Sequence, residues 1–95
     1  MTTLEGNFQF PNGAPVANGT VTLLLSWDSS ESITSPDGVV VASELMSFAL
    51  DENGSIVPAS IWGNTELSGS TYYIVNVYDQ NGVPVLKAPL TWTLS

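Results

Sequence analysis

Apolar and polar residues alternate along several short runs of this chain. In the run from Thr20 to Trp27, one face collects the apolar residues Val21, Leu23, Leu25 and Trp27. Successive side chains of a β-strand point to opposite faces of the sheet, so this spacing predicts a strand with one buried face. No window keeps the i, i+3, i+4 spacing of an amphipathic helix. The pattern therefore predicts an all-β protein.

Asn-Gly and Asp-Gly pairs separate the runs. Asn, Asp and Gly tolerate the positive φ that tight β-turns require, so each pair predicts a turn. The pairs are Asn12-Gly13, Asn18-Gly19, Asp37-Gly38, Asn53-Gly54 and Asn81-Gly82. Between them we expect short strands from Leu4 to Phe10, Thr20 to Trp27, Val39 to Ala42, Leu45 to Leu50, Ser55 to Ile61, Thr71 to Asp79, Val83 to Lys87 and Leu90 to Leu94. Seven or eight short strands in a chain of about 100 residues are typical of an antiparallel β-sandwich.

Two further runs repeat the alternation and complete the expected core. Each places its large apolar side chains on one face, which we expect to point into the sandwich. These side chains are Met46, Phe48 and Leu50 in one run, and Leu90, Trp92 and Leu94 in the other.

The run from Thr71 to Asp79 is apolar on both faces. Tyr73, Val75 and Val77 share one face, and the other carries Tyr72, Ile74 and Tyr78 beside the polar Asn76. One interpretation is a central strand whose second face is covered by neighbouring side chains or a loop. The other is a binding or assembly surface, because contiguous exposed aromatic residues usually mark a partner site.

Trp62 lies in the long connection from Pro58 to Ser70, which we expect to be a surface loop like the connection from Asp28 to Gly38. Its indole either closes the end of the sandwich or stands exposed in a recognition loop. Together with Tyr72, Ile74 and Tyr78, Trp62 forms the set of candidate partner-binding residues.

Composition narrows the classes of function. The 95 residues suffice for one domain, 1–95, with a single core, and a hydrophobic content of 43% indicates a folded protein. One basic side chain against nine acidic ones gives a net charge of −8. Such a surface has almost no positive charge with which to bind the phosphates of nucleic acids or anionic lipids. We therefore expect neither nucleic-acid nor membrane partners.

The chain has no His and no Cys, which are the usual zinc ligands and the usual bases and nucleophiles of small active sites. We therefore expect no enzymatic activity, no metal and no cofactor. Calcium at the turn from Asp51 to Gly54, or among Asp28, Glu31 and Asp37, is a minor alternative, because the ligand spacing of a calcium-binding loop is absent. Lys87 is expected to protect a strand edge, with an isopeptide bond to an Asn as the other interpretation.

A segment near the middle of the chain resembles a known family. Leu67-Ser68-Gly69-Ser70-Thr71-Tyr72-Tyr73-Ile74-Val75-Asn76-Val77 resembles the fibronectin type III pattern L-x-P-x-T-x-Y-x-V-x-V, with Gly69 where that family usually has Pro. Leu23-x-Leu25-x-Trp27 is similar to the second strand of the family and its core Trp. The resemblance implies that Tyr73 is a tyrosine corner, with its hydroxyl bonded to the backbone near Leu67.

The opening of the chain resembles a second group. The segment from Gly6 to Val21, with its Gly13-Ala14-Pro15-Val16 turn, is similar to the start of carboxypeptidase-regulatory-like and transthyretin-like domains. The later turns from Asp51 to Gly54 and from Asp79 to Gly82 also fit that group. Both groups are Ig-like, so the expected fold class is an all-β, Ig-like antiparallel β-sandwich of seven to eight strands.

The resemblance also implies a kind of role. Domains of this style occur in bacterial surface proteins and as accessory domains of phage tail, neck and capsid proteins. The first residues lack the basic region and apolar run of a signal peptide, which fits a virion or cell-surface protein made in the cytoplasm. We expect a non-catalytic structural module that acts through a protein partner or self-assembly. The alternative is a carbohydrate- or receptor-binding module that uses the loop and strand aromatics.

Overall fold

The computed structural model describes all residues from Met1 to Ser95 and contains six β-strands and no α-helix. The all-β class is thereby confirmed, whereas the count of seven or eight strands is not. No helix long and apolar enough to cross a membrane is present. The strands are β1 (Thr2–Leu4), β2 (Thr20–Ser26), β3 (Leu45–Ala49), β4 (Ala59–Ile61), β5 (Tyr72–Tyr78) and β6 (Leu90–Trp92).

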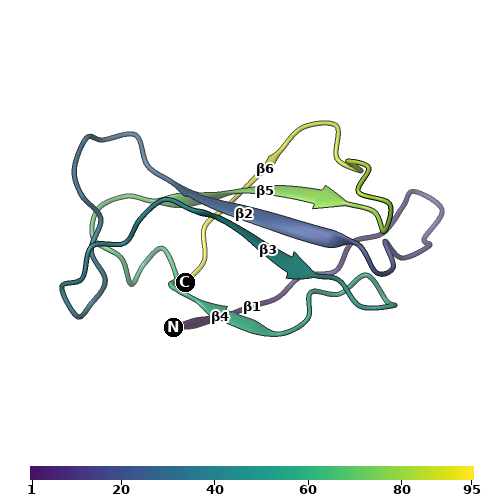
Figure 1. The fold of residues 1–95 in the computed structure, drawn as a ribbon, viewed down its shortest axis with the longest axis horizontal. Coiled ribbons are helices and arrows are strands. Elements are labelled where there is room, and N and C mark those ends of the chain that lie inside the picture. The colour runs from purple at the N-terminus through teal and green to yellow at the C-terminus, as the bar shows by residue number, and fades with distance from the viewer.

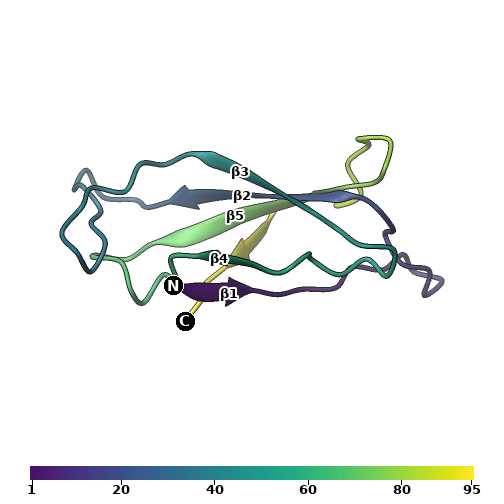
Figure 2. The same ribbon diagram turned by 60° about the horizontal axis from the view of Figure 1, so that its bottom comes forward.

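The strands form two antiparallel sheets that lie in two layers (Figures 1 and 2). The larger sheet has the order β3-β2-β5-β6, and the smaller sheet consists of β1 and β4. Figure 2 shows the small sheet against one face of the large sheet. This arrangement fits a β-sandwich. We refer to the face of the large sheet that meets β1 and β4 as the inner face, and to the opposite one as the outer face.

The core lies between the sheets and is built mainly on β2 and β5, the two central and longest strands. Their inner-face residues are adjacent in register, since Val21 pairs with Val77, Leu23 with Val75 and Leu25 with Tyr73. All six side chains are at most 3% exposed. The buried face predicted for the run from Thr20 to Trp27 is therefore confirmed at Val21, Leu23 and Leu25, while Trp27 follows the strand and is half-buried.

Two of the expected strands do not form. From Val39 to Ala42 the chain forms one isolated bridge, between Thr34 and Val40, and both Val39 and Val40 are exposed. The segment from Val83 to Lys87 likewise pairs with β5 only through a bridge between Tyr78 and Pro84. Two hydrogen bonds flank Pro84, from the Asp79 N–H to the Val83 carbonyl and from the Val85 N–H to the Val77 carbonyl, and the pairing does not continue past them.

The expected strands from Leu4 to Phe10 and from Ser55 to Ile61 lie side by side, but their pairing is discontinuous. Regular pairing joins only β1 and β4, and an isolated bridge joins Asn7 to Ser55. Pro58 separates these two regions and cannot donate a backbone hydrogen bond. The small sheet is therefore shorter than the alternation of residues predicted.

The expected core residues of β3 and β6 are covered only in part. Leu50 is buried, but Met46 and Phe48 are half-buried, and Leu90 is 39% exposed. Both strands are edges of the large sheet, and the small sheet has only two strands with which to cover them. On β6, Trp92 stacks on Phe8 with ring centroids 6.0 Å apart, which shields part of that edge.

Candidate functional site

The four residues predicted to bind a partner occupy two separate places. Tyr72, Ile74 and Tyr78 lie on the outer face of β5, because the residues that alternate with them point into the core. Trp62 follows β4 in the small sheet and packs against the core. The hydroxyl of Tyr73, on the inner face of β5, donates a hydrogen bond to the Trp62 carbonyl 2.5 Å away. The structure therefore groups the three β5 residues but places Trp62 on the other side of the large sheet.

No element of secondary structure covers the outer face (Figure 2). Leu24 pairs in register with Leu45 on one side and with Ile74 on the other, which gives a continuous apolar row across three strands. Leu24 and Ile74 are half-buried by their neighbours, and Leu45 is 60% exposed. Thr22, on the same face, is only 7% exposed, so neighbouring side chains cover part of this face.

One end of the outer face is hollowed beside Tyr72. The Tyr72 hydroxyl donates a hydrogen bond to Asp28 Oδ1 at 3.0 Å, and this bond and the charge of Asp28 raise the pKa of Tyr72. The hollow has a volume of about 640 Å³. Its lining consists of Tyr72, Gly69, two carboxylates and five hydroxyl side chains. The carboxylates are Asp28 and Glu31, and the hydroxyl residues are Ser29, Ser70, Thr71, Thr91 and Thr93. We call this hollow the Tyr72 groove. Its hydroxyl and carboxylate groups can exchange hydrogen bonds with a polyhydroxylated molecule.

Trp62 lines a different cavity, a crevice of about 330 Å³ between β3 and β4. Leu25 and Tyr73 form its buried floor, Met46 and Ile61 contribute from the strands on either side, and Glu44 supplies its one carboxylate. Sequence reasoning missed this crevice. Val41 and Ala42, which also line it, were expected in a strand of their own, and the run from Ser55 to Ile61 was expected to form a longer strand.

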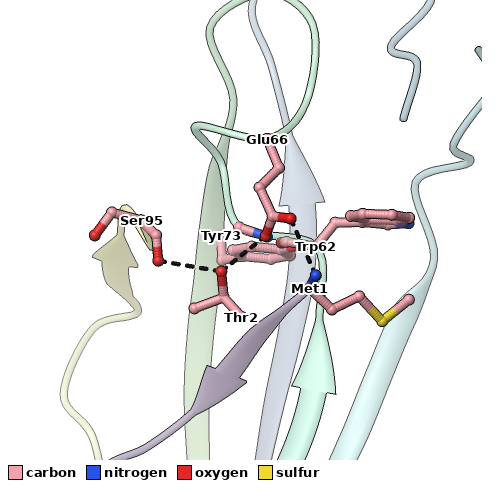
Figure 3. A network of polar contacts seen from close by, with 7 residues as sticks. Met1, Thr2, Trp62, Glu66, Tyr73 and Ser95 are labelled. Atoms are coloured by element: carbon pink, nitrogen blue, oxygen red, sulfur yellow. Dashed lines mark hydrogen bonds and ion pairs between the residues drawn. The ribbon is translucent and has the colours of Figure 1, made fainter. Parts of the chain in front are cut away.

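The chain termini meet next to Trp62 in a polar network (Figure 3). Glu66 Oε1 accepts hydrogen bonds from the Gly63 N–H at 2.9 Å and from the Thr2 hydroxyl at 2.8 Å. Glu66 Oε2 lies 3.1 Å from the Met1 amino group, and Thr2 Oγ1 lies 3.1 Å from the Ser95 carbonyl oxygen. The Gly63 hydrogen bond, followed by those from Thr2 and the amino terminus, lowers the pKa of Glu66 below its usual 4.5.

This network makes stability depend on pH in the acid range. Because the pKa of Glu66 is lower in the folded chain, its stabilising effect is complete above the unfolded value near 4.5. The effect disappears as the pH falls through the folded pKa. We expect the difference in unfolding free energy between wild type and Glu66→Gln to be constant near neutral pH and to shrink below about pH 4.5. Urea unfolding over that range measures the difference, and a gap that widens in acid would contradict the assignment.

The hydrogen-bond acceptor expected for the Tyr73 hydroxyl is wrong. The Tyr73 hydroxyl bonds to the Trp62 carbonyl and not to the backbone near Leu67. Tyr73 belongs to the large sheet and Trp62 directly follows β4, so the bond joins the two layers. Burial, followed by the charge of Glu66, raises the pKa of Tyr73. Leu67 instead has its side chain in the core.

No group of three or more His, Cys, Asp or Glu side chains gathers to hold a metal ion. Asp51 stabilises the turn in which it lies, because its Oδ1 accepts hydrogen bonds from the N–H groups of Asn53 and Ser55. Lys87 is exposed. No protein-family model, curated protein or solved structure matches the chain.

Proposed function

We propose that the chain is a non-catalytic structural module, an Ig-like β-sandwich that serves as a building block or accessory domain of a phage virion or surface appendage and acts through protein contacts. The observation that carries this proposal is the outer face, which no other strand or helix covers, with its apolar row of exposed Leu45 and half-buried Leu24 and Ile74. Exposed apolar patches of this kind mark interaction sites on soluble proteins.

The distribution of charge supports the same conclusion. None of the four strands of the large sheet contains a charged residue, although the chain has nine acidic side chains and a net charge of −8. A neighbour can therefore approach the middle of the outer face, around Leu24 and Ile74, without direct contact between like charges, while Asp28 and Glu31 lie at the Tyr72 end. The remaining repulsion acts over a distance and is screened by salt, with a Debye length of about 10 Å at 0.1 M. Association through this face should strengthen as the salt concentration rises.

Size-exclusion chromatography with light scattering over a salt series tests the proposal. We expect a defined oligomer that is favoured by salt and is disrupted by Ile74→Asp or Tyr78→Asp. Val39→Asp is the matched control, because it adds the same charge at an apolar loop residue that is 63% exposed. A monomer at every salt concentration, or weaker association at higher salt, would contradict assembly through the outer face.

The Tyr72 groove favours a second candidate function, the recognition of carbohydrate. Sugar-binding sites combine an aromatic ring, which packs on the apolar face of the sugar, with polar side chains that fix its orientation. Tyr72 supplies the ring, and Asp28, Glu31 and the surrounding hydroxyls supply the polar groups. The groove differs from the expected carbohydrate site, because that site included Trp62.

A glycan array tests this candidate. If the groove binds a sugar, Tyr72→Ala should abolish the signal, whereas Trp62→Ala should leave it unchanged because Trp62 lines the crevice. A signal that depends on Trp62 and not on Tyr72 would move recognition to the crevice. No binding to any glycan, together with salt-dependent oligomers, would leave assembly as the function.

A further inference from the structure

Strand β3 has one unpaired backbone edge. The Leu50 N–H, just after β3, donates to the Gly19 carbonyl. Because the backbone groups of successive residues point to opposite sides of a strand, Phe48 and Met46 also direct theirs toward β2. The odd-numbered residues Leu45 and Ser47 therefore direct their N–H and C=O groups away from the sheet. Neither residue makes a backbone hydrogen bond outside the sheet, and both are exposed. At the end of the strand, the Ala49 carbonyl is already bonded to the Val57 N–H.

This edge lacks the features by which proteins usually protect free strands. Lysine, proline, bulges and very short strands discourage pairing at an edge. The five residues of β3 include no charged residue and no proline, whereas β6, the opposite edge, has three residues and follows Pro89. The edge of β3 is thus the most accessible backbone of the large sheet for another strand.

The crevice lies directly beside this free edge. Met46 points from the inner face of β3 into the crevice, and Ile61 lines it from β4. Met46 and Phe48 remain half-buried because no strand lies beyond β3 to cover them. A strand added to β3 would place every second side chain over this opening, since alternate residues of a strand share a face. The crevice volume, about 330 Å³, is near the lower end of the range for ligand pockets, roughly 300–1,000 Å³.

We propose that β3 and the crevice together bind an extended segment of another protein, which adds a fifth strand to the large sheet and inserts alternate apolar side chains into the crevice. Main-chain hydrogen bonds at Leu45 and Ser47 supply affinity, and the crevice selects the side chains. This proposal rests on the proposed role in protein contacts, but it uses a different surface from the outer face.

Charge indicates the chemistry of the segment. Glu44 stands at the start of β3 and lines the crevice, and the whole chain has a net charge of −8. A segment that contains Lys or Arg is attracted to this edge, and the attraction weakens with salt. A second copy of the chain fits less well, because it carries the same net charge and a single Lys. The occupant is therefore a basic segment with alternating apolar residues.

A synthetic peptide in which Val and Thr alternate between flanking lysines is the probe, and NMR of the ¹⁵N-labelled chain is the readout. We expect saturable shifts of the amide signals of Ala42, Leu45 and Ser47. Ser47→Pro removes the outward N–H without removing a bond to β2, and it should weaken binding about tenfold or more. Ser47→Thr, which keeps the N–H, is the matched control and should bind as wild type does.

Further variants keep the test decisive if Ser47→Pro fails to fold. Ala42→Trp fills the exposed rim of the crevice and should also abolish binding, and Glu44→Gln should weaken it and reduce its salt dependence. Tyr78→Asp, which tests the outer face, should leave peptide binding unchanged. The proposal is overturned if no saturable shifts occur, if they map to the outer face of β5, or if the chain alone dimerises through β3 in a manner that Ser47→Pro abolishes.

Discussion

Replacement of Gly54 by alanine should lower the free energy of unfolding by about 3 kcal/mol or more. Gly54 has a φ of +73°, a conformation that costs an L-residue about 1–2 kcal/mol. An alanine Cβ there would also overlap the Phe8 carbonyl oxygen and lie 3.0 Å from the Val16 nitrogen. These backbone atoms cannot easily move, because the Val16 N–H donates to the Phe8 carbonyl and the Phe8 N–H donates to the Gly54 carbonyl. Since 1 kcal/mol shifts Tm by roughly 4–8 °C in a domain of this size, Tm should fall by about 12 °C or more.

The chain contains a matched control for this substitution. Gly82 has a φ of +78° and ends a turn of the same type, but a Cβ there would have nothing within 4 Å. In each turn the aspartate Oδ1, of Asp51 or Asp79, accepts two backbone N–H bonds. Gly82→Ala should therefore cost only the conformational penalty of about 1–2 kcal/mol. Thermal unfolding of both variants measures the difference, and equal losses would show that the contact with Phe8 and Val16 carries no cost.

The two turns show how far sequence could predict the fold. The pattern Asp-x-Asn-Gly specifies a turn through local chemistry alone, so both turns were predictable and both are present. That Phe8 and Val16 pack against one turn and not the other depends on contacts between segments far apart in the sequence. The same distinction explains the strands, because alternation predicted the face of β2 that is buried but not how far each strand stays paired.

The candidate site likewise has features that the sequence predicted and features that it could not predict. Alternation alone placed Tyr72, Ile74 and Tyr78 on one face of β5, as the structure has them. Their neighbours, such as Leu24 and Asp28, follow from strand order and loop position, which no local pattern encodes. The crevice beside Trp62 exists because the small sheet has two short strands and leaves the edge of β3 uncovered. Such a cavity arises where an expected strand is shorter than its pattern suggests, so sequence could not have located it.

Truncation of Tyr73 to alanine should destabilise the fold by about 3–5 kcal/mol, the range observed for large buried aromatic residues. Tyr73 is 2% exposed on the inner face of β5, and its hydroxyl donates the hydrogen bond to Trp62 that joins the two layers (Figure 3). Tyr73→Phe keeps the ring but deprives the Trp62 carbonyl of its donor, so it should cost about 1–2 kcal/mol. Chemical denaturation of the two variants separates the contribution of the ring from that of the hydroxyl.

Tyr72→Phe is the control for the hydroxyl, because the adjacent Tyr72 also donates a hydrogen bond but does so to Asp28 on the exposed outer face. Water can replace that bond, so its loss should change stability by no more than about 0.5 kcal/mol. If Tyr73→Phe is as mild as Tyr72→Phe, the bond to Trp62 does not hold the layers together. If Tyr73→Phe is the more costly, the bond to Trp62 does hold the two layers together. Tyr73 and Trp62 also both line the crevice. A ligand in the crevice would then stabilise wild type against denaturant, as any ligand specific to the folded state does.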